Sequence, residues 1–144
     1  MFIIRPMTLA DYDAFIDLMK KTPGVSIRDA DSLDATARYL KRNPGLSFVA
    51  VVEGRVEGCL MSGHDGRRGY LQHLVVAEPL RRKGIGTALI EHCLTALGAQ
   101  GIRKNHLDVF RTNTAAASYW AKRGWTLRTD INRFSLVHGG GANA

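Results

Sequence analysis

The spacing of apolar residues changes repeatedly along the chain, and each change marks the boundary of an expected element. Short apolar or alternating runs are typical of strands, whereas apolar residues three and four positions apart are typical of one helix face. The first half predicts strand 2–6, helices 9–20 and 32–42, and strands 46–52, 56–61 and 70–76. The second half predicts helix 87–97, strand 105–110, helix 114–123, and strands 125–128 and 133–137. Asn113 and Gly124 are expected to cap the last helix at its two ends.

Turn residues indicate how these elements connect. Asn43-Pro44-Gly45 ends one helix, Glu53-Gly54-Arg55 joins two strands as a hairpin, and the glycine-rich segment 63–69 leads into the next strand. A three-stranded meander is thus followed by alternating helices and strands. We predict an α/β fold with a mixed, mostly antiparallel central sheet of about seven strands flanked by about four helices. We expect a single domain over residues 1–137 and a disordered tail over residues 138–144.

Length and cysteine usage narrow the class of protein. A chain of 144 residues is long enough to bury about two thirds of its unfolded surface in one core. Cys59 and Cys93 form no close-spaced metal or redox motif, so we expect reduced thiols and no metal site, although sequence alone leaves a disulfide open. No long apolar signal-peptide core and no run of about 18 apolar residues occurs. We therefore expect a cytoplasmic protein with no membrane contact.

Positive charge is concentrated in the C-terminal part of the chain. The formal net charge is +7, and residues 41–144 contain 15 of the 20 basic side chains but only 7 of the 13 acidic ones. A nucleic-acid-binding protein usually presents a basic helix or a platform of aromatic and basic residues, and neither is evident. We therefore expect no nucleic-acid partner. An anionic small molecule explains the clustering more economically, with general surface basicity as the alternative.

The segment Arg81-Arg82-Lys83-Gly84-Ile85-Gly86 is the strongest candidate for a binding site. It follows strand 70–76 and opens helix 87–97, so a phosphate placed there would meet unpaired N–H groups and the positive end of the helix dipole. The two glycines allow a ligand to approach the backbone and permit positive φ angles, while three cations add charge. Neither the nucleotide P-loop nor the dinucleotide fingerprint occurs. The alternative interpretation is a solvated helix start.

Two motifs in this chain resemble those of one known family. Arg81-x-x-Gly84-x-Gly86 is similar to the Gln/Arg-x-x-Gly-x-Gly/Ala motif of the Gcn5-related N-acetyltransferase (GNAT) superfamily. A second segment, about thirty residues downstream, resembles the family's Asn-x-x-Ala-x-x-aromatic-Tyr-x-x-x-Gly-Phe helix and turn. It reads Asn113-x-x-Ala116-x-x-Tyr119-Trp120-x-x-x-Gly124-Trp125. The resemblance covers nearly the whole chain. The segment Gly63-x-Asp65-Gly66-x-Arg68-Gly69 also resembles a bacterial subgroup of the family that includes the YpeA-like proteins.

The resemblance implies an N-acetyltransferase domain with a GNAT-like fold. Its cosubstrate would be acetyl-CoA, and the acetyl group would move to a primary amine by direct attack in a ternary complex. The acceptor would be a small molecule, a protein N-terminus or a lysine. No metal is implied.

The resemblance also implies the residues that hold the cofactor. Backbone groups of residues 82–87 would bind the pyrophosphate, while Leu74 and Val76 would pair with the pantetheine arm as if it were a strand. The N–H of Leu74 or its neighbour would stabilise the oxyanion, and Asn113 would reach the pantetheine or the acetyl end. The cofactor-binding candidates are Leu74, Val75, Val76, Arg81, Arg82, Lys83, Gly84, Ile85, Gly86, Thr87, Asn113, Ala116 and Trp120. Structural roles, as core residues or as a helix cap, are compatible with these assignments.

Three residues are candidates for the catalytic chemistry: Asp108, Trp120 and Tyr70. Asp108 falls where related enzymes acting on protein N-termini carry a Glu base, and burial in an apolar strand would favour its protonated form; a salt-bridged structural role is the alternative. Trp120 stands where the family usually has a Tyr acid. An indole N–H does not transfer a proton at neutral pH, so we assign Trp120 to the wall of the acetyl pocket. Tyr70 shares strand parity with Leu74 and is expected to face the acceptor, whereas His73 has the opposite parity unless a bulge intervenes, which favours a core or capping role.

Two other functions compete with acetyl transfer. A non-catalytic CoA-binding sensor or regulatory protein is favoured by Trp120 and by the absence of a carboxylate on strand 70–76. A basic nucleic-acid-binding domain is favoured by charge alone. The closing strand 133–137 offers an edge for a homodimer.

Overall fold

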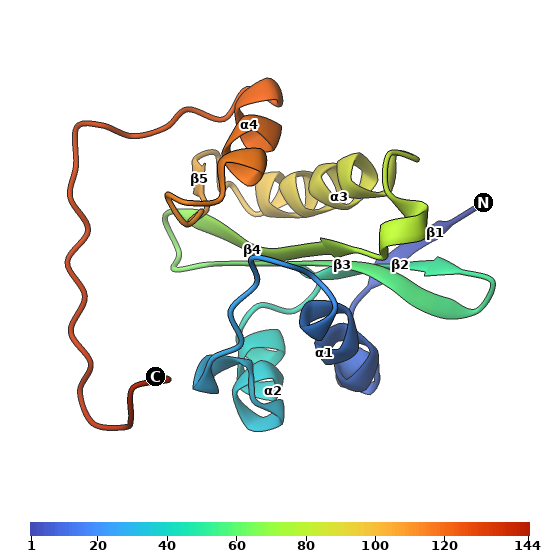
Figure 1. Cartoon of the computed structure of the whole chain (residues 1–144), viewed down its shortest axis with the longest axis horizontal. Helices are drawn as coiled ribbons and strands as arrows, with labels where there is room; N and C mark the ends of the chain where they lie inside the picture. Colours follow the sequence, from blue (N-terminus) through green and yellow to red (C-terminus); the bar gives the residue numbers. More distant parts are fainter. The chain divides into compact units, whose positions relative to one another are not determined.

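The computed structural model describes residues 1–144, which form two compact units, residues 1–107 and 108–144. The first unit contains a five-stranded sheet and the helices α1 to α3, and the second contains the helix α4. Figure 1 shows these elements coloured along the chain.

The sheet of the first unit has the strand order β1-β2-β3-β4-β5. The strands are β1 (Ile3–Pro6), β2 (Phe48–Val52), β3 (Arg55–His64), β4 (Gly69–Val76) and β5 (Asn105–His106). The first four pair antiparallel to their neighbours, and β5 pairs parallel to β4. The predicted mixed, mostly antiparallel sheet is therefore confirmed.

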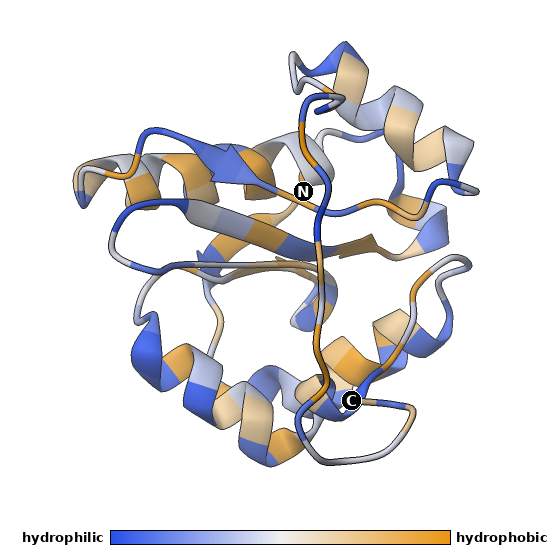
Figure 2. Cartoon of the chain, turned by 90° about the vertical axis from the view of Figure 1, so that its left-hand side faces the viewer, coloured by the Kyte–Doolittle hydropathy of each residue, from blue (hydrophilic) through white to orange (hydrophobic).

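Helices cover both faces of this sheet. They are α1 (Tyr12–Lys20), α2 (Leu33–Arg42) and α3 (Ile85–Ala99), with short 3-10 helices η1 (Leu9–Asp11), η2 (Asp29–Asp31) and η3 (Glu78–Leu80). Figure 1 shows α1 and α2 on one face and α3 on the other. In Figure 2 the helices alternate between blue and orange, as expected of helices with one buried face.

The core has a layer on each face of the sheet. On the α1 face, Phe15 and Met19 are fully buried against β2, β3 and β4. On the α3 face, the buried side of the helix comprises Ile85, Leu89, Ile90, Cys93 and Leu97. Gly58 of β3 permits the close approach of α3, because a Cβ there would lie 3.2 Å from Cγ2 of Ile85. This packing fixes where α3 begins, and with it the preceding loop.

The predicted number of strands is wrong: the sheet has five strands, not seven. Residues 125–128 and 133–137 form no strand, and the expected strand 105–110 is reduced to β5. Alternating polar and apolar residues indicate only that a segment is suited to a sheet. A strand also needs a neighbour with which to pair, and the local pattern contains no information about that neighbour.

The second unit confirms the predicted caps of its helix, α4 (Thr114–Lys122). The Oδ1 atom of Asn113 accepts a hydrogen bond of 3.1 Å from the Ala116 N–H, which satisfies one of the unpaired donors of the first turn. At the other end Gly124 has a φ of +89°, and the N–H of Trp125 bonds to the carbonyl of Trp120. This is a Schellman motif, which requires a left-handed residue at the glycine position.

A half-buried ion pair near the start of the chain, between Arg5 and Asp11, contributes to the stability of the fold. Arg5 donates two hydrogen bonds of 2.8 Å to the carboxylate of Asp11, which is only 6% exposed. These bonds hold the pKa of Asp11 below its ordinary value, against the opposing effect of burial. We expect Asp11→Ala to lower the free energy of unfolding by about 2 kcal/mol at pH 7, because it leaves the guanidinium and the Thr8 N–H without their acceptor.

The Arg5–Asp11 pair also determines how the free energy of unfolding changes with pH. A carboxyl with a lowered pKa contributes stability above its unfolded pKa, and that contribution is lost as the pH falls through its folded pKa. Urea unfolding of the wild type and of Asp11→Ala should therefore differ at pH 7 and converge toward pH 3. Asp13→Ala, which removes an exposed aspartate nearby, is the matched control. Equal stabilities of wild type and Asp11→Ala at pH 7 would contradict this role.

Candidate active site

The glycine loop before α3 forms an open cradle of backbone amides. Gly84 is the N-cap of α3, with a φ of +87°, and Arg82 also has a positive φ of +65°. The first hydrogen bond of the helix runs from the Ala88 N–H to the carbonyl of Gly84, at 3.0 Å. The amides of Ile85 and Gly86 therefore have no intrahelical acceptor. Alternating left- and right-handed residues turn successive N–H groups toward one anion.

The structure refines two sequence-based expectations for this loop. Gly86 lies in the first turn of α3, and the second positive φ belongs to Arg82 instead. Arg81 uses its side chain within the protein, because its Nε donates to the carbonyl of Val76 at 3.0 Å. This bond ties the loop to the end of β4. The side chains of Arg82 and Lys83 are exposed.

The outer edge of β4 is open beside this loop. The strand β5 pairs with β4 only at Gly69 and Tyr70, and no further strand follows β5 in the sheet. Residues 71–76 of β4 therefore have β3 on one side and no strand on the other. Leu74 and Val76 are half-buried, whereas Val75 points into the core and is 1% exposed. An extended ligand could pair with this edge as an additional strand.

A bulge interrupts β4 at its centre and changes the predicted facing of its side chains. Met61 of β3 pairs with Gln72 of β4, and Cys59 pairs with Val75. The two β3 residues are two positions apart, whereas their partners on β4 are three positions apart, so β4 contains one extra residue. The extra residue is accommodated at His73, which has a φ of +61°. Parity is therefore broken between Gln72 and Val75, and the expectation that Tyr70 shares a face with Leu74 by simple alternation is wrong.

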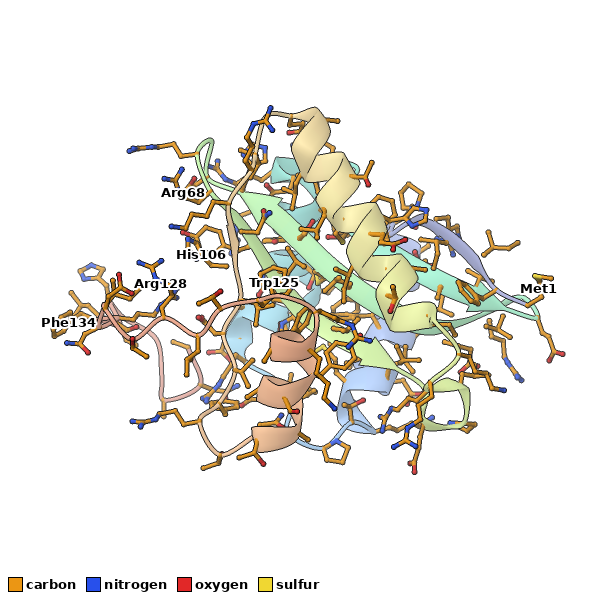
Figure 3. The ribbon with its side chains drawn as sticks, turned by 90° about the horizontal axis from the view of Figure 1, so that it is seen from above. Met1, Arg68, His106, Trp125, Arg128 and Phe134 are labelled. Carbon is orange, nitrogen blue, oxygen red and sulfur yellow. The ribbon has the colours of Figure 1, made fainter.

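Tyr70 lies at the junction of β4 and β5. It is opposite His106 in the parallel pairing, and the two rings are 5.7 Å apart between their centroids. The Tyr70 side chain remains 36% exposed. Figure 3 labels His106 on β5 and Arg68 on the neighbouring β3–β4 turn. In that turn the Asp65 carboxylate accepts the N–H groups of Arg67 and Arg68, and these two bonds are the leading reason its pKa is lowered.

The remaining predicted residues lie in the second unit. Trp120 of α4 packs edge-on against Tyr119 and Trp125, with ring centroids 5.4 and 5.3 Å apart. Ala116 is half-buried on the same helix, and Asn113 caps it. These contacts hold the Trp120 indole among aromatic rings.

Asp108 does not have the buried position expected of it. The strand that was to contain it ends at His106, and the Asp108 side chain is 74% exposed, with its Oδ2 atom 3.2 Å from Nη1 of Arg133. The carboxylate is thus part of a surface ion pair within the second unit. Ion pairs at this exposure are weak and screened by salt.

One residue pair was missed by the sequence analysis. The Nε2 atom of His73 lies 2.8 Å from Oδ1 of Asp31 in η2, and both side chains are largely buried. The two residues are 42 positions apart in the sequence, and no local pattern connects them. Only the bulge, whose presence was left open, turns the imidazole toward η2.

Other features of the first unit offer no comparable chemistry. A groove of about 990 Å³ lies beside α1, and six of its charged lining residues form the ion pairs Arg5–Asp11, Lys21–Asp17 and Arg55–Glu57. Its other charged lining residues are Glu78 and Arg81, next to the glycine loop. Both cysteines are free and buried, and burial raises the pKa of Cys93 to about 12, so this thiol is not a nucleophile at neutral pH. No group of three or more His, Cys, Asp or Glu side chains is arranged to hold a metal ion. None of the helices has both the length and the apolar character needed to cross a membrane.

Solved structures with the same fold come from several acetyltransferases. A structure of the PaiA N-acetyltransferase from Thermoplasma acidophilum, in complex with coenzyme A, matches with a TM-score of 0.79 and 17% identity, covering 91% of this chain and 93% of that one. Ard1 from Thermoplasma volcanium matches with a TM-score of 0.78 and 19% identity, covering 89% and 84% of the two chains. These likenesses concern the fold.

Sequence relatives identify the family. An acetyltransferase of Pectobacterium atrosepticum is 34% identical over 119 residues, which are 83% of this chain and 84% of that protein. An acetyltransferase of Yersinia pseudotuberculosis is 35% identical over 94 residues, covering 65% of this chain and 67% of that protein. Residues 12–125 match the sequence pattern shared by the acetyltransferase (GNAT) family. The chain therefore belongs to the GNAT family of N-acetyltransferases.

Proposed function

We propose that this protein transfers the acetyl group of acetyl-CoA to a primary amine by direct attack in a ternary complex. The observation that carries the proposal is the juxtaposition of the amide cradle at Gly84 with the open outer edge of β4. We further propose that residues 1–137 act as one N-acetyltransferase domain, because the family match spans both compact units. The YpeA-like subgroup, the cytoplasmic location and the homodimer stay predictions.

The residues of the loop fit a pyrophosphate. Backbone groups of residues 82–87 would hold it at the positive end of α3, with Arg82 and Lys83 adding charge. A Cβ built on Gly84 would meet no atom within 4 Å, so the space above this cradle is open. Arg81 would act by holding the loop against β4 rather than by touching the ligand, given its bond to the Val76 carbonyl. The coenzyme A in the structure of PaiA supports this ligand.

The residues of β4 fit the pantetheine arm. Backbone groups of Leu74, Val75 and Val76 would pair with its amides along the open edge. For Asn113, Ala116 and Trp120 of the second unit, a role in cofactor binding stays a prediction. The Oδ1 atom of Asn113 already accepts a bond from Ala116, so its amide nitrogen would be the group that reaches the cofactor.

The reaction needs a neutral amine, a stabilised carbonyl oxygen and a leaving thiolate. Bound acetyl-CoA would supply a reactive thioester. The N–H of Leu74 would donate to the carbonyl oxygen as negative charge develops there. Trp120 would form the wall of the acetyl pocket and would not act as an acid, because an indole N–H does not ionise near neutral pH. A thiol leaves acceptably as its anion, since a free thiol has a pKa of about 8.5.

One alternative remains, a CoA-binding sensor without catalysis. It is favoured by Trp120 in the place of the family's usual tyrosine, and by the absence of a carboxylate on β4. The sensor and the enzyme share the ligand but differ in turnover with amines.

Calorimetric titration tests the ligand that both functions share. We expect acetyl-CoA to bind saturably with one site per chain. Pantetheine, which lacks the pyrophosphate and the nucleotide, should bind at least about 100-fold more weakly, because it forfeits the charge-assisted bonds of the cradle. Equal affinity for pantetheine would contradict the pyrophosphate assignment, and no binding of acetyl-CoA would contradict the proposed function.

A further inference from the structure

The bulge of β4 presents an imidazole that is held by a buried carboxylate. His73 has a φ of +61°, a left-handed conformation that non-glycine residues seldom adopt. Its Nε2 atom is 2.8 Å from Oδ1 of Asp31, and the side chains of His73 and Asp31 are 19% and 8% exposed. Unusual backbone conformations of this kind concentrate where a side chain must be aimed for function.

Asp31 is itself fixed from two sides. Its Oδ2 atom accepts the N–H of Arg28 at 2.8 Å, and its backbone carbonyl accepts the hydroxyl of Tyr12 at 2.7 Å. Burial raises the pKa of Asp31, but the hydrogen bonds from His73 and Arg28 outweigh it and hold the pKa below its ordinary value. An ionised carboxylate only accepts hydrogen bonds, so Nε2 of His73 must carry the proton.

This arrangement leaves the other ring nitrogen as the basic one. With the proton on Nε2, a neutral imidazole has its lone pair on Nδ1. Nδ1 accepts no hydrogen bond within the protein. The fully buried side-chain atoms without a partner are Tyr39 Oη and Asn105 Oδ1, and Nδ1 of His73 is not one of them. Nδ1 is therefore not fully buried, in a side chain that is 19% exposed. The ring also packs against Phe15, with the centroids 5.9 Å apart, and this contact limits its rotation.

The pair adjoins the proposed acetyl position. His73 is followed directly by Leu74, whose N–H is proposed to contact the carbonyl oxygen, and consecutive Cα atoms are about 3.8 Å apart. The other polar groups that contact the pair are the Tyr12 hydroxyl of α1 and the Arg28 amide. The side chains in contact with the His73 ring are Asp31 and Phe15. Asp108, by contrast, is exposed and paired with Arg133.

We infer that His73 is the proton acceptor of the acetyl transfer and that Asp31 is the residue that positions it. The inference rests on the proposed function and names a base for it. As the nitrogen of the neutral amine bonds to the carbonyl carbon, the carbon–sulfur bond breaks and its electron pair leaves on sulfur. Nδ1 of His73 takes the proton that the nitrogen loses. The imidazolium then returns this proton to the thiolate, directly or through water, which restores the neutral ring.

The test compares the pH dependence of turnover in wild type and variants. His73→Asn is the main variant, because asparagine tolerates a positive φ and accepts no proton. Asp31→Asn keeps the imidazole but removes the charge that holds it. Asp108→Asn tests the competing base, and His92→Gln, on the exposed side of α3, is the matched control. All are assayed with acetyl-CoA and a panel of spermidine, kanamycin and an alanyl-lysyl peptide, using the amine that the wild type acetylates fastest.

We expect His73→Asn to lower kcat about 100-fold and to remove the fall in activity at acid pH, with acetyl-CoA affinity unchanged by calorimetry. Asp31→Asn should lower kcat about 10-fold with acetyl-CoA affinity unchanged, because the imidazole has lost the carboxylate that holds it in place. A purely structural role of the pair would lower stability and leave the acid limb of the pH profile in place in His73→Asn. His92→Gln should behave as wild type.

Two outcomes would overturn the inference and are distinguishable. If His73→Asn keeps its turnover and its acid limb while Asp108→Asn loses both, Asp108 is the base and the proposed function stands. If the wild type acetylates none of the three amines, the inference and the proposed function fail together. Melting curves and circular dichroism establish that each variant is folded.

Discussion

Replacing Gly84 by valine is expected to lower the affinity for acetyl-CoA by about 100-fold, which corresponds to about 2.7 kcal/mol. Gly84 has a φ of +87°, and a β-branched residue is strongly disfavoured in this conformation. A Cβ at this position meets no neighbour within 4 Å, so the substitution introduces no clash. The loss should come from rotation of the backbone, which turns the amides of the cradle away from the pyrophosphate.

The matched control is Gly66→Val in the β3–β4 turn. Gly66 has a φ of +95° and also has open space around its Cβ position, so the same backbone strain is introduced away from the cradle. Calorimetry should show that Gly66→Val binds acetyl-CoA as the wild type does. If Gly84→Val is folded and binds with unchanged affinity, the pyrophosphate lies elsewhere.

Removing the N–H of Leu74 is expected to produce the second large effect. Leu74→Pro should lower kcat by about 100- to 1000-fold at saturating acetyl-CoA, which is the usual effect of losing one donor to a developing oxyanion. Proline is tolerated at a bulge and on an open strand edge, and Leu74 lies at both. We therefore expect the fold to survive the substitution.

Leu74→Ala separates the amide from the side chain. It shortens the same half-buried side chain but retains the N–H, so its kcat should stay within a few-fold of the wild type. Steady-state rates of both variants at saturating cofactor, with melting curves, provide the measurement. Equal losses in the two variants would show that the side chain of Leu74 matters and its amide does not.

Much of the fold follows from local patterns in the sequence. The apolar spacing of α1, with Phe15 and Met19 on one face, predicts both the helix and the face that it buries. The caps Asn113 and Gly124 likewise predict the ends of α4, because side-chain capping and a left-handed glycine are local requirements. The glycine loop is predictable for the same reason, since its position before a helix determines its chemistry.

What the sequence could not predict depends on contacts between distant segments. The bulge at His73 arises from the register of β4 against β3, and the imidazole meets Asp31 only because η2 packs beside α1 and β4. The exposed position of Asp108 has a similar cause. The apolar neighbours Leu107 and Val109 indicated a buried strand, but β5 ends at His106.

Amine-dependent release of the coenzyme A thiol is the measurement that tests the proposed acetyl transfer most directly. Purified protein is mixed with acetyl-CoA and, in turn, with spermidine, kanamycin or the alanyl-lysyl peptide, and free thiol is followed with a chromogenic disulfide. We expect thiol release above the uncatalysed rate with at least one amine, matched by an equal amount of acetylated product. Saturable binding of acetyl-CoA without acetylation of any of these amines would contradict the enzyme and favour the sensor.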